Sequence, residues 1–237
     1  MVKSIAIVGG SSDIAKSTIS SMSADNYKFH VLVRNDSYTD ELSALGVSVV
    51  LGDATSEEDI KNFISGVKES GEIHAILHCV GSFAVRPPHA INKEAFETVI
   101  STNLTSAFLT LSIAGKAMLS QGHGRMVFMS SVAGSLGLVN HEAISAAKGG
   151  VESMVRSAAA TYANRGLRIN AVAPGLTDTK LASPIMSNET ASQAASQKIP
   201  IKRVGQKEEV ANVIKWLLTE APENFTGQIL HTDGGMS

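Results

Sequence analysis

The sequence predicts an α/β fold: a doubly wound domain in which a seven-stranded parallel sheet is covered by helices on both faces. Short apolar runs rich in β-branched residues alternate with helical stretches along the 237 residues. Most of these runs are apolar at every position, as expected for strands that are buried on both sides. The length suits one domain spanning residues 1–237 better than two.

Each strand is predicted from an apolar run that ends at turn-forming residues. Strands are expected at 4–8, 29–33, 47–51, 75–80, 125–129, 167–172 and 227–232. Helices are expected after residue 13, at 55–68, at 93–119 with a bend near 101–103, at 142–164 and at 208–218. The second of these has Thr55 and Glu58 in the spacing of a capping box. Residues 176–206 are polar and small, so we expect a mobile flap over a site.

Composition excludes several classes of function. The net charge of −2 gives no broad basic field, so neither nucleic acid nor an anionic membrane is expected as a partner. Cys79 is the single cysteine, which excludes an internal disulfide and fits a reducing compartment. The chain has no signal-peptide pattern, no apolar run judged long enough to span a bilayer, and no predicted metal site. These observations predict a soluble, cytoplasmic protein.

A glycine-rich turn follows the first predicted strand. Gly9 begins this turn of small residues, and a helical pattern starts after Asp13. The free N–H groups and the dipole of a helix start favour a phosphate, so a nucleotide pyrophosphate is expected at Ser11, Ser12, Asp13 and Ile14. The alternative is an ordinary turn between a strand and a helix. Asp13 beside a phosphate is unfavourable unless its side chain turns away or caps the helix.

Two polar residues follow the second and third strands. Arg34 stands where an adenosine ribose would lie, and its guanidinium favours a 2′-phosphate, hence NADP(H) over NAD(H). The alternative is a solvated surface arginine. Asp53 either accepts a hydrogen bond from an adenine amino group or only stabilises its own turn.

The order and spacing of these motifs resemble the short-chain dehydrogenase/reductase family over nearly the whole chain. The matching positions are 8–15, Asp53 with Ala54, 78–81, Asn103, Ser131, Pro174 with Gly175 and Thr179, 199–203 and 226–235. The resemblance implies a Rossmann-like fold, NADP(H) as cofactor, a small-molecule carbonyl or alcohol substrate, and a homo-oligomer, either a dimer or a tetramer.

The resemblance also implies a role for each matched residue. Ser131 would hold the carbonyl oxygen, Lys148 would bind the nicotinamide ribose, and Asn103 would fix a water chain that ends at the lysine. On the cofactor side, Val80 and Gly81 would line the adenosine ribose. Thr177 and Thr179, after Pro174 and Gly175, would bond the carboxamide and the diphosphate.

One position departs from the family pattern. The family has a tyrosine four residues before the lysine, and this chain has Ile144 there. A missing proton donor costs on the order of 10²–10⁴ in rate unless something replaces it. The candidates are Lys148 itself, His141 one helical turn before Ile144, and a water or a substrate group. The sequence therefore predicts an oxidoreductase with an atypical proton donor. The alternatives are a non-catalytic dinucleotide-binding sensor or partner subunit, and a scaffold that has lost the cofactor as well.

Overall fold

A seven-stranded parallel sheet forms the centre of the molecule, as predicted. The computed structural model describes residues 3–22 and 27–237. The strand order is β3-β2-β1-β4-β5-β6-β9, and every neighbouring pair is parallel. The strands are β1 (Lys3–Val8), β2 (Tyr27–Val33), β3 (Ser48–Leu51), β4 (Ile73–His78), β5 (Gly124–Met129), β6 (Leu167–Pro174) and β9 (Ile229–Thr232).

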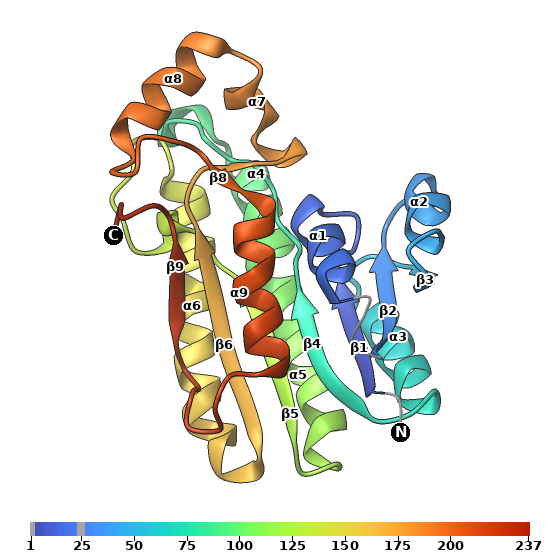
Figure 1. The fold of residues 1–237 in the computed structure, drawn as a ribbon. Helices are drawn as coiled ribbons and strands as arrows, with labels where there is room; N and C mark the ends of the chain where they lie inside the picture. Colours follow the sequence, from blue (N-terminus) through green and yellow to red (C-terminus); the bar gives the residue numbers. More distant parts are fainter. Residues whose placement is uncertain (1–2, 23–26) are drawn as a thin grey trace.

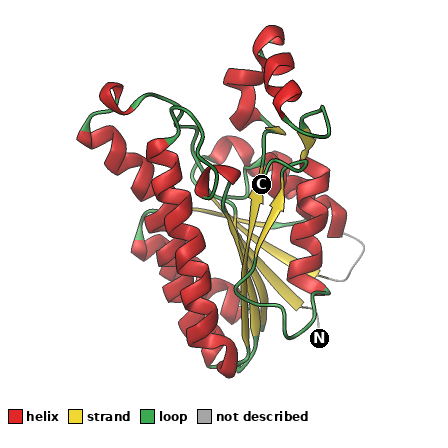
Figure 2. Ribbon diagram, turned by 90° about the vertical axis from the view of Figure 1, so that its left-hand side faces the viewer, coloured by secondary structure: helices red, strands yellow, loops and turns green. Residues whose placement is uncertain are grey.

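Helices cover both faces of this sheet (Figure 2). The main helices are α1 (Asp13–Met22), α3 (Glu57–Glu69), α4 (Lys93–Ile100), α5 (Ser106–Leu119), α6 (Glu142–Tyr162) and α9 (Lys207–Thr219). Ile5 and Ile7 of β1 face one core cluster, together with α1 and α9. Ala6 and Val8 face the other, together with α3, α5 and α6. The strand is apolar from Ile5 to Val8 because each of its faces meets a separate helix layer.

From β1 the chain adds β2 and β3 on one side and then returns to add β4 on the other side of β1. At such a switch point in the strand order, a crevice opens at the carboxyl ends of the strands. These ends lie at the top of Figure 1. The predicted motifs at Gly9, Arg34, Gly81, Ser131 and Gly175 all follow strand ends on this side. The topology therefore brings residues that are distant in sequence to one edge of the sheet.

The predicted elements are present, and their boundaries shift by one or two residues. The expected cap at Thr55 is wrong: the N-cap of α3 is Ser56, whose Oγ accepts a hydrogen bond from Asp59 N at 3.2 Å. Thr55 instead donates its hydroxyl to Asp53 Oδ1 at 2.8 Å. The sequence analysis also missed the short helix α2 (Thr39–Ser43), which buries only Leu42.

The polar segment 176–206 contains more structure than the predicted flap. It begins with β7 (Thr177–Asp178) and ends with β8 (Gly205–Gln206), and these two strands pair in parallel. Between them lie α7 (Ser183–Met186) and α8 (Glu189–Lys198), which stand above the carboxyl ends of the sheet (Figure 1). We call residues 176–206 the strap, because the short β7–β8 pair fastens its two ends together.

The predicted helix at 93–119 is bent as expected. It divides into α4, a π-helical turn at Ser101–Thr105 and α5. The stretch Lys93–Leu119 is long and apolar enough to cross a membrane by length and composition alone, which corrects the expectation that no run has that length. Since 44% of its most apolar part is buried in the fold, its hydropathy fits a core helix equally well.

Candidate active site

Lys148 lies buried at the centre of the site. Its side chain is 5% exposed, and its Nζ donates to the carbonyl of Met129, at the end of β5, over 2.8 Å. Burial lowers the pKa of Lys148 to about 8, and the nearby Cys79 thiol acts in the opposite direction. Within residues 3–22 and 27–237, no carboxylate forms an ion pair with this ammonium. A buried, unpaired lysine of this kind is typical of functional sites.

Asn103 occupies the π-helical turn between α4 and α5. The turn is wider than an α-helix, because Ser106 N bonds to the carbonyl five residues earlier, at Ser101. This π-helical turn lies at the place where the sequence predicts a bend. Asn103 is fully buried, and its Nδ2 donates to Ser82 Oγ at 2.8 Å and to Val99 O at 2.9 Å. Its Oδ1 accepts from Ser82 N at 3.2 Å, which ties this turn to the loop after β4.

Gly81 is the point at which these groups converge. A Cβ on this glycine would lie 3.6 Å from Asn103 Oδ1 and 3.9 Å from Lys148 Nζ. It would lie equally close, at 3.9 Å, to Leu181 Cδ2 of the strap. The fold thus brings the predicted asparagine and lysine together beside an exposed glycine, where a ligand can approach the backbone.

Ser131 stands directly after β5. Its extended backbone (φ −163°, ψ 154°) starts a short 3₁₀ turn, and its Oγ accepts from Ala133 N at 3.2 Å. No described residue accepts the Ser131 hydroxyl proton, so the hydroxyl can donate to an oxygen of a ligand. The serine and Lys148 are therefore linked through the end of β5, because Lys148 bonds the carbonyl of Met129 and Ser131 follows two residues later.

Sequence reasoning missed a buried carboxylate behind this turn. Glu152 is 4% exposed, and its Oε1 accepts from Ser130 Oγ at 2.8 Å. The same oxygen would lie 2.6 Å from a Cβ on Gly134, so this carboxylate supports the turn that carries Ser131. The available signal was an acidic residue four positions after Lys148, on the helix face that packs on the sheet.

Ile144, four residues before Lys148 on α6, is buried. It is 6% exposed and packs in an apolar cluster with Val99, Ala133, Ala143 and Ala147. Its side chain offers no group that can donate a proton. His141 precedes α6, which begins at Glu142, and its Nδ1 lies 2.7 Å from the carbonyl of Val139. The helix has therefore not begun at His141, so helical spacing does not fix the direction of its ring.

The opening turn is shaped by two glycines. Gly9 has φ +87°, and a Cβ there would lie 2.8 Å from the side chain of Val80 and 2.9 Å from the backbone of Cys79. At Gly10 a Cβ would lie 1.7 Å from Val31 Cγ1. Both glycine N–H groups donate to the carbonyl of Leu32, at 3.0 and 3.1 Å. The turn therefore sits tightly between β2 and β4 and leads into α1, where Ser11, Ser12 and Ile14 lie at the helix start.

The Asp13 carboxylate, which would be unfavourable beside a phosphate, has partners in the strap and on α1. Its Oδ2 accepts a hydrogen bond from Lys180 N at 2.6 Å, and its Oδ1 lies 3.5 Å from Lys16 Nζ. The carboxylate therefore turns away from the helix start and faces the strap.

Arg34 and Asp53 lie at the ends of β2 and β3. Arg34 is exposed. Asp53 Oδ1 accepts from Thr55 N and from Thr55 Oγ1, both at 2.8 Å. The Thr55 N–H holds the pKa of Asp53 below its usual value, and the charge of Arg34 contributes further. Asp53 thus stabilises its turn while it faces the same region as Arg34; its predicted contact with adenine stays a prediction, as does the place of Ala54 beside it.

The segment after β6 brings the remaining predicted residues to the base of the strap. Gly175 lies against Asp233, since a Cβ on this glycine would be 3.0 Å from Asp233 Cα. Thr177 is buried and donates to Gly175 O at 3.1 Å, and Thr179 donates to Thr177 O at 3.3 Å. These hydroxyls are held by local bonds, and their contacts with a cofactor stay predictions.

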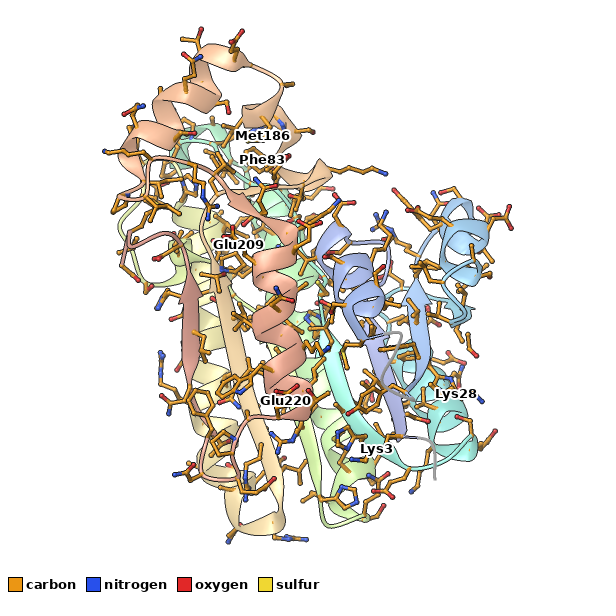
Figure 3. All side chains as sticks on the ribbon, viewed as in Figure 1. Lys3, Lys28, Phe83, Met186, Glu209 and Glu220 are labelled. Carbon is orange, nitrogen blue, oxygen red and sulfur yellow. The ribbon has the colours of Figure 1, made fainter. Side chains whose placement is uncertain are left out.

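The mouth of the site is apolar. Phe83 is 39% exposed and Leu181 is 51% exposed. Figure 3 labels Phe83, in the loop after β4, and Met186, which ends α7 of the strap. These apolar side chains come from the loop after β4 and from the strap, and they favour an apolar ligand surface.

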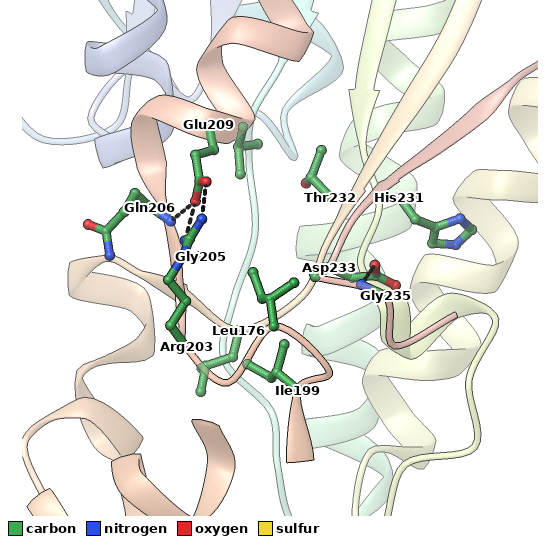
Figure 4. A pocket seen from close by; sticks show the side chains of 13 residues that line it. Leu176, Ile199, Arg203, Gly205, Gln206, Glu209, His231, Thr232, Asp233 and Gly235 are labelled. Carbon is green, nitrogen blue, oxygen red and sulfur yellow. Dashed lines mark hydrogen bonds and ion pairs between the residues drawn. The ribbon is translucent and has the colours of Figure 1, made fainter. Parts of the chain in front are cut away.

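A separate cavity of about 280 Å³ lies between the strap, the start of α9 and the C-terminal residues (Figure 4). Arg203 crosses its wall and forms a bidentate pair with Glu209, at 2.8 and 2.6 Å. Gln206 N donates to the same carboxylate at 2.8 Å. This cavity does not include Ser131 or Lys148, and its charged groups already satisfy one another.

Comparison with known proteins places this geometry in a family. A family model described as enoyl-(acyl carrier protein) reductase matches residues 9–237. The 3-oxoacyl-(acyl-carrier-protein) reductase MabA of Mycobacterium tuberculosis is 32% identical over 235 residues, which cover 99% of this chain and 92% of that protein.

Solved structures agree with the sequence relatives. ElxO with NADP bound is similar with a TM-score of 0.93 at 27% identity, covering 100% of this chain and 99% of that one. A tyrosine-to-phenylalanine variant of ElxO with NADPH bound gives the same values. A short-chain type dehydrogenase/reductase from Mycobacterium ulcerans has a TM-score of 0.92 at 27% identity, covering 99% of this chain and 89% of that one. With a family model over nearly its whole length and a relative of this identity, the chain belongs to the short-chain dehydrogenase/reductase family.

Proposed function

We propose that this chain is an NADP(H)-dependent oxidoreductase that interconverts a carbonyl and an alcohol, with Lys148 as proton donor in place of the family tyrosine. The relatives support the reductase class and the cofactor, since MabA is named a reductase and ElxO is solved with NADP. The residues present suit the cofactor: Gly81 leaves space for a ligand near the backbone, Gly9 lets the opening turn pack tightly against β4, and Arg34 offers a cation for the 2′-phosphate. NADPH, when bound, supplies the hydride.

Two protein groups carry the remaining chemistry. Reduction of a carbonyl places negative charge on its oxygen, which must be held and then protonated. In this proposal the Ser131 hydroxyl donates a hydrogen bond to that oxygen. Lys148 gives up one ammonium proton to it, directly or through a water, and regains a proton from solvent. Asn103 keeps the neighbouring π-helical turn in place through its bonds to Ser82.

The observation that carries the proposal is the buried, unpaired ammonium of Lys148. Because its pKa is lowered to about 8, it is protonated at neutral pH and still gives up a proton more readily than an ordinary lysine. An activity that depends on this proton falls as the pH rises through about 8. His141, a water and a substrate group are the alternative donors, and the rate of a His141→Ala variant tests the first of them.

A second candidate function rests on Ile144. Its burial in an apolar cluster removes the hydroxyl from the place where the family pattern has one, and this favours a dinucleotide-binding sensor or partner subunit without turnover. The ElxO variant, solved with NADPH and a phenylalanine in place of a tyrosine, supports the idea that loss of a tyrosine hydroxyl is compatible with cofactor binding.

The proposal includes a homo-oligomer and a cytoplasmic location. Phe96 and Phe108, on α4 and α5, are 39% and 55% exposed, and this supports burial against another subunit. Light scattering after size-exclusion chromatography tests it: a dimer or tetramer is expected, and a monomer at micromolar concentration would contradict it.

The function is tested in two steps. The first is a fluorescence titration with NADPH and, in parallel, NADH; preferential binding of NADPH is expected, and binding of neither would refute the proposal. The second is turnover of the bound protein with a panel of small carbonyl compounds, for the wild type, Lys148→Ala and Lys116→Ala, an exposed lysine of α5. Turnover that is lost only in Lys148→Ala supports the proposal. Turnover that survives this change overturns the role of Lys148, and binding with no turnover in any protein favours the second candidate.

A further inference from the structure

The strap is attached to the opening turn by the side chain of Asp13. Asp13 is the first residue of α1, and its Oδ2 accepts a hydrogen bond from Lys180 N at 2.6 Å. The two residues are 167 positions apart in sequence. The bond therefore holds the backbone of the strap directly above the first turn of α1.

From this anchor the Lys180 side chain extends towards β2 and the segment that follows it. Its Nζ lies 6.0 Å from the centre of the Tyr38 ring, and Lys16 Nζ lies 5.8 Å from the same ring. Tyr38 ends a 3₁₀ turn at Asp36–Tyr38, directly after Arg34 and Asn35. Asn35 Oδ1 caps this turn by accepting from Ser37 N at 2.9 Å. The side chain of Lys180 therefore reaches from α1 to the turn that follows Arg34.

The two ammonium groups beside Tyr38 differ in their partners. Lys16 donates to Glu41 at 2.9 Å and lies near Asp13, so its charge is neutralised. Lys180 has no hydrogen-bond or ion-pair acceptor for its ammonium among the described residues, and only the Tyr38 ring lies near it. Its charge acts at longer range on Glu41, whose pKa is lowered first by the bond from Lys16 and then by both lysine charges.

We propose that Lys180, held in place by Asp13, is a second cation for the 2′-phosphate of NADP(H) and determines the preference for this cofactor together with Arg34. The proposal rests on the proposed NADP(H) site. An unpaired ammonium at the crevice mouth, beside the turn that follows Arg34, is placed to pair with a phosphate dianion. Asp13 acts as a positioning residue, because its carboxylate bonds the backbone of Lys180.

The test compares dissociation constants for NADPH and NADH by fluorescence titration of the full chain. The variants are Lys180→Met, Asp13→Ala and the double variant. Lys198→Met, which removes an exposed lysine of α8 in the same strap, is the matched control for the loss of one positive charge. We expect Lys180→Met to weaken the binding of NADPH about fivefold, as for one partly exposed ion pair, and to leave the binding of NADH unchanged. The control variant should bind both nucleotides as the wild type does.

Two further results follow from the geometry. Asp13→Ala releases the strap backbone, so it should also weaken the binding of NADPH. In the double variant the loss of affinity should be no larger than in Lys180→Met alone. The difference between the wild type and Lys180→Met should shrink at high salt, because a charge pair at the surface is screened.

The outcomes separate this inference from the proposed function. Equal NADPH binding by the wild type and Lys180→Met overturns the role of Lys180 and leaves the NADP(H) site intact. An equal loss of affinity for NADPH and NADH in Lys180→Met also overturns it, because that result assigns Lys180 to the pyrophosphate, which both nucleotides share. Failure of the wild type to bind either nucleotide refutes the proposed function itself.

Discussion

Replacing Lys148 by methionine should change the way in which stability depends on pH. The substitution removes the ammonium and keeps a long, unbranched side chain in the buried position. In the folded protein the pKa of Lys148 is about 8, against 10.5 for the ordinary side chain. Between these values the unfolded chain binds the proton more strongly than the folded one, so the free energy of unfolding rises with pH in this window.

The magnitude follows from the pKa. One pKa unit corresponds to about 1.36 kcal/mol, so the wild type should gain about 2 kcal/mol between pH 7 and about pH 9.5 from this residue. The methionine variant lacks that gain. At pH 7 the net effect of the substitution should be small. Relief of the desolvated charge opposes loss of the bond to Met129 O, which is worth about 1.5–3 kcal/mol for a charged donor.

Urea unfolding of both proteins at the two pH values measures this difference, and the other titrating groups cancel in the comparison. Lys116→Met, which removes an exposed lysine from α5, is the control and should follow the wild type. The reasoning is refuted if the Lys148→Met variant gains as much stability with pH as the wild type, because the buried ammonium would then carry no desolvation cost.

Three further substitutions test the site and its support. Ile144→Tyr should raise the rate of NADPH oxidation about 100-fold, because it restores a positioned acid, and should cost ~1–3 kcal/mol from overpacking. Gly9→Ala should abolish nucleotide binding, measured by fluorescence, because the residue has φ +87° and no room for a Cβ. Glu223→Gln should cost ~1–2 kcal/mol in urea unfolding. Its carboxylate lies 2.8 Å from Arg125 Nη2 and 3.2 Å from Arg168 Nε, and those guanidiniums are mostly buried.

Contrary results would be equally informative. Unchanged turnover in Ile144→Tyr would mean that the substrate pocket, and not only the proton donor, has diverged. Nucleotide binding that survives in Gly9→Ala would move the pyrophosphate away from the opening turn. For Glu223 the control is Glu220→Gln, an exposed neighbour with no described ion pair. Equal losses of unfolding free energy in the two variants would mean that the ion pairs of Glu223 with Arg125 and Arg168 have no special role.

The order of strands and helices was predictable because burial leaves a local record in the sequence. The apolar run at 4–8 became β1, and its alternate residues face two helix layers. The cap of α3 was predicted at Thr55 but lies at Ser56. Both hydroxyl residues suit a helix start, and the bond from Thr55 to Asp53 leaves Ser56 as the cap. The strap was predicted as a mobile flap, and its strands were missed because two-residue strands such as β7 and β8 leave no periodic signal.

The sequence by itself determined the fold class, the seven strands, and the positions of Ser131, Lys148 and Asn103, because these depend on local periodicity and on motif spacing. Only the tertiary structure decided the environments of these residues. In the folded chain Lys148 is buried without a carboxylate as ion-pair partner, Glu152 lies behind the turn that carries Ser131, and Asp13 bonds Lys180. Spacing along the chain specifies which residue types are present. A pKa, an ion pair or a contact across 167 positions depends on what the folded chain brings within a few ångströms.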